Sequence, residues 1–275
     1  MYDIFILSVI QGVTEFLPVS SSGHLILLPS LMGMQDHNMT VDGILHFGTL
    51  CAVIVYFWRD IMLMVGAFFK TLFQGKEARV SDAKQLASST AFYFRLSMML
   101  ILATIPVVVA GFVAKRFGVD ALRTPFVIGV MSIVGGMILL LSDLMGRHNR
   151  SLLDLKYSHA FLIGCAQIFS LIPGGSRSGM CLIGARLLCY DRVSAVTFTF
   201  LMAIPSVGGA FTLIMYDAMK EGLLLPWQDM ALYFLLSFSF GLMTIHFMLR
   251  FVSRLSLVPF GLYRIALGLG ILMWG

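Results

Sequence analysis

The stretch Gln11-Gly-Val-Thr-Glu-Phe-Leu-Pro-Val-Ser-Ser-Ser-Gly-His24 lies in an apolar region that runs from residue 4 to residue 35, and its part 17–24 interrupts that region. Pro173-Gly-Gly-Ser-Arg-Ser-Gly179 interrupts a second apolar region, 157 to 190. Proline cannot continue the hydrogen-bond ladder of a helix, and loop backbone exposed to lipid is not tolerated inside a membrane. Each region therefore predicts a helix, a buried polar loop and a second helix, which is the pattern of a re-entrant hairpin.

The composition places the rest of the chain in a membrane. Of its 275 residues, 59% are apolar and only 12% are charged, far from the balance of a soluble domain. Six further apolar runs reach the length of about 20 residues that a helix needs to cross the hydrocarbon core. These runs cover roughly 44–68, 94–114, 124–146, 193–216, 229–250 and 257–275. The sequence predicts an all-α polytopic membrane protein with six transmembrane helices and two re-entrant hairpins.

The basic residues predict the orientation. If both hairpins return to the side from which they entered, most of the 19 Lys and Arg residues fall in loops on one face, which the positive-inside rule makes cytoplasmic. The residues on that face are Arg59, Lys70, Lys76, Arg79, Lys84, Arg95, Arg147, Arg150, Lys156, Arg186, Arg192, Arg250 and Arg254. Both termini and the active site are then expected on the outer side. Because the net charge of +5 arises largely from these loops, nucleic acid is not expected as a partner.

The two halves of the chain share a pattern. Gln11 precedes the pair Ser22-Gly23 by the same spacing with which Gln167 precedes Ser178-Gly179, and three spans follow each hairpin. With three crossings between them, the hairpins enter from opposite faces, so their loops are expected to meet near the membrane midplane. The chain is thus predicted to be one integral membrane domain, 1–275, built as an inverted repeat of about 1–150 and 151–275.

Two charged side chains are predicted to meet at this midplane. Glu15 is the only glutamate inside an apolar stretch, and Arg177 is one of two arginines so placed. A charge at that depth is costly and normally has a partner and a function. Gln11 lies four residues before Glu15, so both side chains share one helix face.

The loops also carry groups suited to phosphate chemistry. Ser20, Ser21 and Ser22 lie within a turn of His24, so Ser21 or a water is expected to attack, with His24 as general base or acid. Arg177 offers a guanidinium fork to phosphate oxygens, and the N–H groups at the helix starts favour an anion. The predicted phosphate-binding residues are Gln11, Ser20, Ser22, Gly174, Ser176 and Ser178.

The two quoted segments, with His46-Phe-Gly-Thr49, resemble those of the undecaprenyl-diphosphate phosphatases, the bacitracin-resistance family, over essentially the whole chain. The resemblance implies hydrolysis of a polyprenyl diphosphate lipid in the bacterial cytoplasmic membrane, with the bilayer and a homodimer as further expected partners. It also implies dependence on a divalent cation, Mg²⁺ or Ca²⁺. Glu15, alone or with Gln11, is expected either to hold this ion or to orient the nucleophile. The family's catalytic positions correspond here to Glu15, Ser21, His24 and Arg177. One position departs from the family, because Cys181 replaces the usual threonine, so Cys181 is left out of the catalytic set.

Other interpretations remain open at this level. A lipid flippase or anion transporter uses the same broken helices, although it has no need for serines beside a histidine. Glu15 and Arg177 could form a structural ion pair, and helix capping is the alternative role of the loop serines, favoured for Ser22 and Ser178. For some polar residues of the spans, interhelical hydrogen bonds or snorkelling are expected in place of catalysis. These residues are His46, Asp143, His246 and Arg264.

Overall fold

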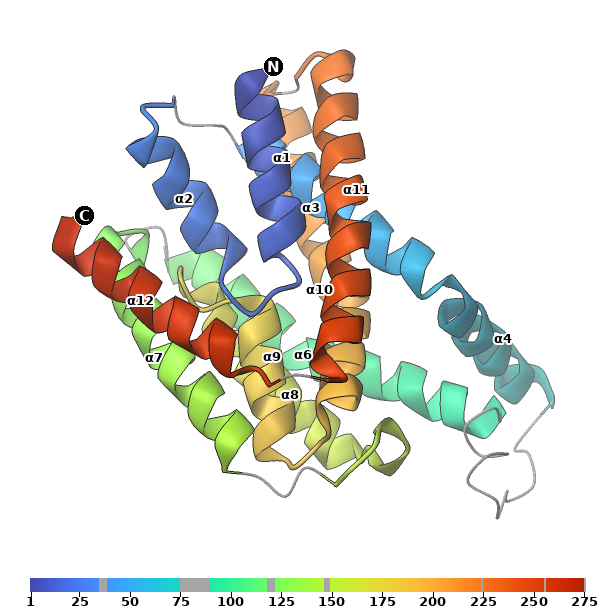
Figure 1. Cartoon of the computed structure of the whole chain (residues 1–275). Coiled ribbons are helices and arrows are strands. Elements are labelled where there is room, and N and C mark those ends of the chain that lie inside the picture. Colours follow the sequence, from blue (N-terminus) through green and yellow to red (C-terminus); the bar gives the residue numbers. More distant parts are fainter. Residues whose placement is uncertain are drawn as a thin grey trace.

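A computed structural model of the chain describes residues 1–34, 39–74, 90–117, 122–145, 149–223, 225–254 and 256–274. Throughout these ranges the chain forms helices and short connections (Figure 1). The long helices are α1 (Tyr2–Thr14), α2 (Ser21–Leu31), α3 (Met39–Tyr56), α4 (Trp58–Gln74), α6 (Thr90–Phe117), α7 (Pro125–Leu144), α8 (Tyr157–Ile168), α9 (Arg177–Leu187), α10 (Arg192–Glu221), α11 (Trp227–Val252) and α12 (Val258–Trp274). Single 3-10 turns are η2 (Leu152–Asp154) and η3 (Phe169–Leu171). The predicted all-α class is confirmed.

Five helices among the described residues, α3, α6, α7, α10 and α11, are long and apolar enough to cross a membrane. The helix of the sixth predicted run, α12, has 17 residues and is apolar but shorter. The predicted run 44–68 is divided at Phe57, where the helix bends, between α3 and α4, and the candidate span is α3. Helical hydrogen bonds continue through the bend, from Phe57 N–H to Val53 and from Ile61 N–H to Phe57. Arg59 and Asp60 open α4, and charges resist entry into hydrocarbon.

Both interrupted regions form two helices joined by a loop, as predicted. Figure 1 shows α1 and α2 in the upper half and α8 and α9 in the lower half, with their loops facing each other. A hydrogen bond of 2.9 Å from the Ser178 hydroxyl to the Leu17 carbonyl joins the two loops directly. α1 packs on α11, and α8 packs on α6.

Small residues permit these packings. A Cβ on Gly12 of α1 would lie only 2.5 Å from the Cβ of Phe240 in α11. A Cβ on Gly164 of α8 would collide with the backbone of Ala103 in α6. Helices that approach so closely bring backbone against backbone, which is how helices associate in lipid. These contacts lie in the last two turns of α1 and α8, directly before the polar loops, and so hold the loops in place.

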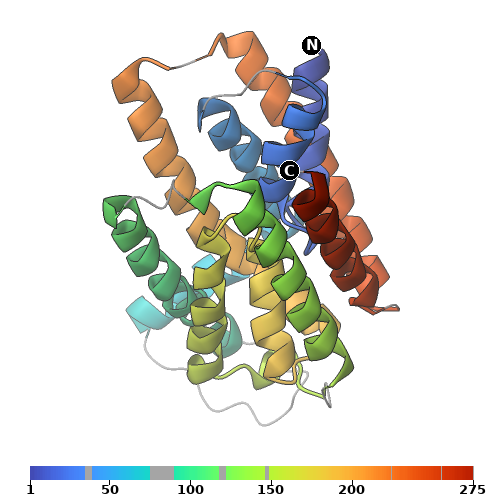
Figure 2. The same ribbon diagram turned by 90° about the vertical axis from the view of Figure 1, so that its left-hand side faces the viewer.

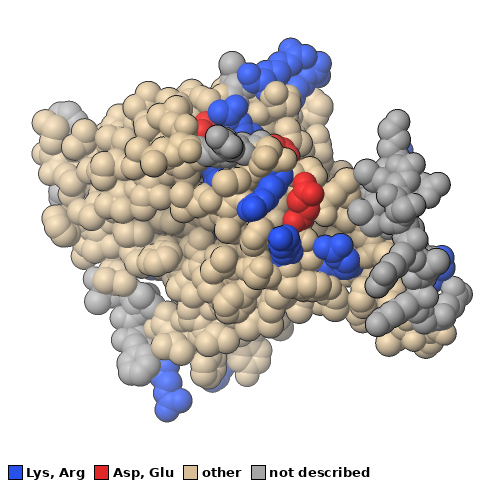
Figure 3. All heavy atoms as spheres, turned by 90° about the horizontal axis from the view of Figure 1, so that it is seen from below, with Lys and Arg blue, Asp and Glu red and all other residues tan. Residues whose placement is uncertain are grey.

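Basic side chains gather at the end opposite the N-terminus (Figure 3). The last residues of α7, α9 and α11 and the first residues of α8, α10 and α12 lie in the lower half of the molecule (Figure 1), whereas both termini lie in its upper half (Figures 1 and 2). Four of the bases counted for this face, Lys76, Arg79, Lys84 and Arg147, lie outside the described residues.

Arg186 does not belong with these loop bases. Its side chain is 1% exposed and pairs with Asp143 of α7 at 2.7 Å. Arg192 also binds the Asp143 carboxylate, with two hydrogen bonds of 3.0 and 2.9 Å. The N–H of Leu257 donates to the same carboxylate. Asp143 thus joins α7, α9, α10 and the segment before α12, in agreement with the interhelical role expected from the sequence.

Candidate active site

Glu15 is the centre of the polar cluster between the two hairpins. It directly follows α1, is 5% exposed, and accepts hydrogen bonds at both carboxylate oxygens. The Arg177 Nη2 donates to Oε1 at 2.7 Å, and the Ser21 hydroxyl donates to Oε2 at 2.7 Å. Gln11 Nε2 also donates to Oε2, at 3.0 Å. The structure therefore brings together four of the predicted site residues, from both hairpins.

His46 of α3 lies beside this carboxylate and makes the kind of interhelical hydrogen bond that was expected for it. Its Nδ1 is 2.8 Å from Gln11 Nε2 and 3.5 Å from Glu15 Oε2. Because the Gln11 amide nitrogen is a donor, the His46 Nδ1 accepts this hydrogen bond. The Gln11 amide is thereby fixed, and its Oε1 is buried without a hydrogen-bond partner among the described residues.

His24 does not contact Ser21, contrary to the expected pairing of a hydroxyl with an imidazole base. Its Nδ1 lies 2.7 Å from the Ser20 carbonyl, and its Nε2 lies 2.7 Å from the Tyr263 hydroxyl. A carbonyl only accepts, so Nδ1 carries a proton, and in the neutral ring Nε2 accepts from the tyrosine. Tyr263 of α12 was missed by sequence reasoning, because nothing in an apolar run reveals a partner 239 residues away.

Ser20 and Ser176 form matching turns at the starts of α2 and α9. Their φ angles are 74° and 63°, in the left-handed region that non-glycine residues rarely occupy. The Ser20 hydroxyl accepts from the Gly23 N–H at 3.3 Å, and the Ser176 hydroxyl accepts from the Gly179 N–H at 3.1 Å. Each such strained residue costs about 1–3 kcal/mol and is typical of functional loops.

The helix-capping role predicted for Ser22 and Ser178 is therefore wrong, because the serine two residues earlier performs it in each hairpin. The Ser22 hydroxyl lies 3.4 Å from the Ser20 hydroxyl. The Ser178 hydroxyl is committed to the Leu17 carbonyl of the other hairpin. Ser178 thus joins the two loops.

The position of Gly174 is set by close packing against α7. Its φ is 87°, and a Cβ would lie 2.6 Å from the Ile128 carbonyl oxygen. Its own carbonyl accepts from Arg264 Nη2 at 3.0 Å. Arg264 is 0% exposed, so the snorkelling considered for it is wrong, and its role is a hydrogen bond between helix and loop.

The oxygen atoms near Glu15 suit a metal ion that also binds a phosphate better than a metal ion held by protein ligands alone. The described residues contain no group of three His, Cys, Asp or Glu side chains that could hold a metal. One carboxylate of Glu15 and the unpartnered Oε1 of Gln11 remain as oxygen donors. Mg²⁺ in phosphate-handling sites commonly takes one or two carboxylates and completes its shell with water and substrate phosphate. Glu15 and Gln11 are compatible with that arrangement.

Cys181 lies behind the loop and not in it. The side chain is 0% exposed, and its Sγ lies 3.4 Å from Gln167 Oε1. The thiol is thus bonded to α8 within its own hairpin.

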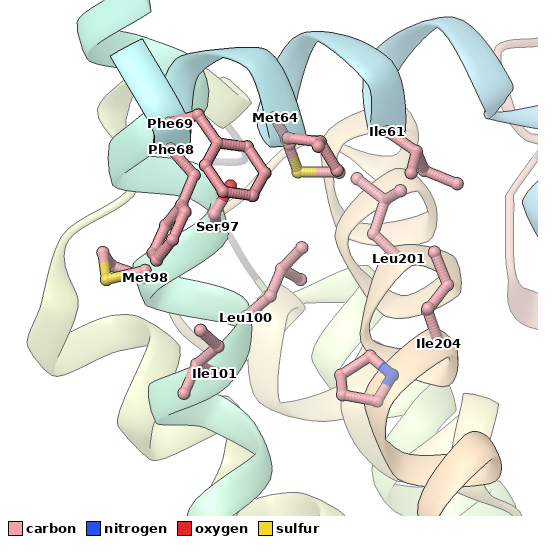
Figure 4. A pocket seen from close by; sticks show the side chains of 12 residues that line it. Ile61, Met64, Phe68, Phe69, Ser97, Met98, Leu100, Ile101, Leu201 and Ile204 are labelled. Atoms are coloured by element: carbon pink, nitrogen blue, oxygen red, sulfur yellow. The ribbon is translucent and has the colours of Figure 1, made fainter. Parts of the chain in front are cut away.

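A separate groove of about 280 Å³ lies between α4, α6 and α10. Phe68, Leu100 and Leu201 are among its walls (Figure 4), and the only side-chain hydroxyl there belongs to Ser97. Hydrocarbon walls offer nothing to bind or cleave a phosphate. The groove is therefore not a candidate phosphate site, and the Glu15 cluster remains the candidate active site.

Comparison with known proteins shows the family of the chain. The family model described as "Bacitracin resistance protein BacA" matches residues 4–270. This chain belongs to the BacA family. A protein named Undecaprenyl-diphosphatase, from Alcanivorax borkumensis, is 37% identical over 273 residues, which cover 99% of this chain and 98% of that relative. The resemblance inferred from the two broken segments is confirmed, and it identifies a multi-pass membrane protein of the BacA family.

Proposed function

We propose that this protein hydrolyses undecaprenyl diphosphate to undecaprenyl phosphate and inorganic phosphate, and so recycles the carrier lipid for peptidoglycan and other envelope polymers. One observation carries the proposal: the Glu15 carboxylate accepts a 2.7 Å hydrogen bond from the Ser21 hydroxyl while it holds Arg177 at 2.7 Å. The base is thus in direct contact with both a hydroxyl nucleophile and a phosphate-binding guanidinium. Membership of the BacA family and the name of the relative support the same activity.

In the proposed reaction, Ser21 is the nucleophile and Glu15 is its base. The Ser21 oxygen bonds to the terminal phosphorus, the bond from that phosphorus to the bridging oxygen breaks, and undecaprenyl phosphate leaves. The hydroxyl proton passes to Glu15 across their hydrogen bond. A water oxygen then bonds to the phosphorus, the bond from phosphorus to the Ser21 oxygen breaks, Glu15 returns the proton to that oxygen, and inorganic phosphate leaves. His24 is the second proposed proton-transfer group, with the Tyr263 hydroxyl as its partner.

Arg177 is the proposed binding residue for the transferred phosphoryl group. Its Nη2 is bonded to Glu15, whereas its Nη1 is buried without a hydrogen-bond partner among the described residues. A guanidinium with a free N–H can bind a phosphate oxygen without releasing the carboxylate. The N–H groups at the starts of α2 and α9 add partial positive charge, so the developing negative charge meets preorganised donors.

A divalent cation, Mg²⁺ or Ca²⁺, is proposed at Glu15 and Gln11, shared with the diphosphate. It would neutralise phosphate charge in the bound substrate. Gln11 is held by Glu15 and His46, so its Oε1 has a fixed position.

The proposed placement in the membrane has six spans and two re-entrant hairpins in an inverted repeat, with the site and both termini on the outer side of the bacterial cytoplasmic membrane. The matching turns at Ser20 and Ser176 support the repeat, because the same φ region and the same cap recur in both hairpins. The basic end of the molecule supports the orientation. Assembly as a homodimer stays a prediction.

Phosphate release by the purified protein tests the proposal. In detergent, the wild-type protein is expected to release inorganic phosphate from a long-chain prenyl diphosphate, and EDTA is expected to lower the rate. Readdition of Mg²⁺ or Ca²⁺ should restore it. A flippase or anion transporter, the competing interpretation, would move the lipid or ion in proteoliposomes without releasing phosphate, and that result would refute the phosphatase.

Tyr263→Phe tests the newly found partner of His24. The substitution keeps the ring, which stacks on His24 at 5.8 Å, and removes only the hydroxyl that bonds Nε2. Because one such hydrogen bond contributes about 0.5–1.5 kcal/mol, kcat is expected to fall about two- to tenfold. Tyr216→Phe, on an exposed position of α10, is the matched control and should leave kcat unchanged. Equal rates for the two variants would remove Tyr263 from the site.

A further inference from the structure

Arg264 of α12 is a buried cation without an anion. Its side chain is 0% exposed, and no carboxylate of the described residues pairs with it. Its Nη2 donates to the carbonyls of Gly174 and Gly175 at 3.0 Å and to that of Met131 at 3.3 Å. Its Nε and Nη1 have no hydrogen-bond partner among the described residues. A guanidinium is always charged and is costly to bury unpaired, so this arrangement requires an explanation.

The position of this cation is unfavourable in the protein alone. A Cβ on Gly179 would lie 2.5 Å from the Arg264 Nη1, so the guanidinium lies against the first turn of α9. The start of a helix carries partial positive charge, which repels another cation. Arg177 begins the same turn, but its charge is already paired with Glu15, so it brings no anion to Arg264. A bound anion would relieve this repulsion.

Arg264 also orients the loop. A trans peptide directs its C=O and the following N–H in opposite directions, and the described residues contain no cis peptide. With the Gly175 carbonyl held by Arg264, the Ser176 N–H points away from Arg264. The carbonyl oxygens of Gly174 and Gly175, which would repel a phosphate, are thereby held on the Arg264 side of the loop.

We propose that Arg264 is a positioning residue of the phosphate site: it holds the Gly174-Gly175 carbonyls away from the anion and adds a buried positive charge behind the loop that attracts the anion. The ligand class is a phosphate or diphosphate group, and the inference rests on the proposed function. Binding of inorganic phosphate, the product, probes it without turnover.

The experiment compares Arg264→Gln, which keeps an N–H donor but removes the charge, with Arg264→Lys, which keeps the charge. Arg254→Gln, at an exposed position before α12, is the matched control. KM and kcat are measured with a prenyl diphosphate, and the thermal midpoint is measured with and without inorganic phosphate. Because Arg264→Gln removes a buried charge that attracts the anion and loosens the two carbonyls, it should raise KM about tenfold and lose the phosphate-induced rise of the midpoint. Arg264→Lys should recover part of both.

A purely structural role gives a different pattern. Arg264→Gln would then lower the midpoint without phosphate, while the folded fraction kept the wild-type KM and the wild-type response to phosphate, and this result would overturn the proposal. If Arg264→Gln does not fold, Arg264→Lys decides: a folded variant with no response to phosphate overturns it, and a retained response with a lower kcat supports it. If the wild-type protein binds phosphate through Arg264 but cleaves no prenyl diphosphate, the proposed function fails and this inference stands.

Discussion

Glu15→Gln is expected to lower kcat by about 10³-fold, within the range that loss of a general base produces. Glutamine has nearly the same shape, so the change isolates the charge. It removes the proton acceptor that lies 2.7 Å from the Ser21 hydroxyl. It also leaves the Arg177 guanidinium, 16% exposed, without its carboxylate. Phosphate release per folded protein is the measurement.

Stability must be followed in the same variant, because breaking a buried ion pair costs about 3 kcal/mol or more. The thermal midpoint in detergent and the elution profile define the folded fraction to which kcat refers. Asp217→Asn is the control, since it removes a carboxylate from an exposed pair with Lys115 at 2.7 Å. It should leave both quantities nearly unchanged. A folded Glu15→Gln protein with more than about a tenth of the wild-type kcat would show that Glu15 is only structural.

The two hairpins could be predicted from the local sequence alone. The meeting of Glu15 with Arg177 could be predicted from the energetic cost of an unpaired charge in an apolar stretch. Breaks rich in proline, glycine and serine act within a few residues, so they can be read without a fold. A charge inside an apolar stretch needs a partner of opposite sign, and few candidates exist in such a chain. The 2.7 Å pair between residues 162 positions apart follows from that scarcity.

The partners of His24 and the loop carbonyls could not be predicted in the same way. A neutral histidine or a backbone carbonyl can be satisfied by any donor, so nothing in the sequence selects Tyr263 or Arg264. Both follow from how α12 packs against α7 and reaches the loops. The same limit explains why the caps were assigned to Ser22 and Ser178: the positive φ at Ser20 and Ser176 is imposed by the hairpin. Strain of this kind is invisible in composition or spacing.

The second large effect is expected from Ser21→Ala, which should reduce phosphate release by about 10⁴-fold, because loss of a nucleophile removes the covalent route altogether. The alanine variant keeps the Glu15–Arg177 contact, so substrate binding should change little. Ser239→Ala, at an exposed serine of α11 bonded only to its own helix, is the matched control and should retain full activity. Acid quenching of the wild-type reaction, followed by mass spectrometry, should find phosphate on the peptide that contains Ser21.

Direct attack by water predicts a different result for this variant. Glu15 could then activate a water in the space vacated by the hydroxyl, and Ser21→Ala would retain a substantial fraction of the wild-type kcat with no phosphopeptide in either protein. Such a result would remove Ser21 as nucleophile while leaving Glu15 and Arg177 in their roles. The activity of Ser21→Ala therefore separates a two-step from a one-step phosphatase, since only in the two-step reaction does the phosphoryl group pass through the Ser21 oxygen that is bonded to Glu15.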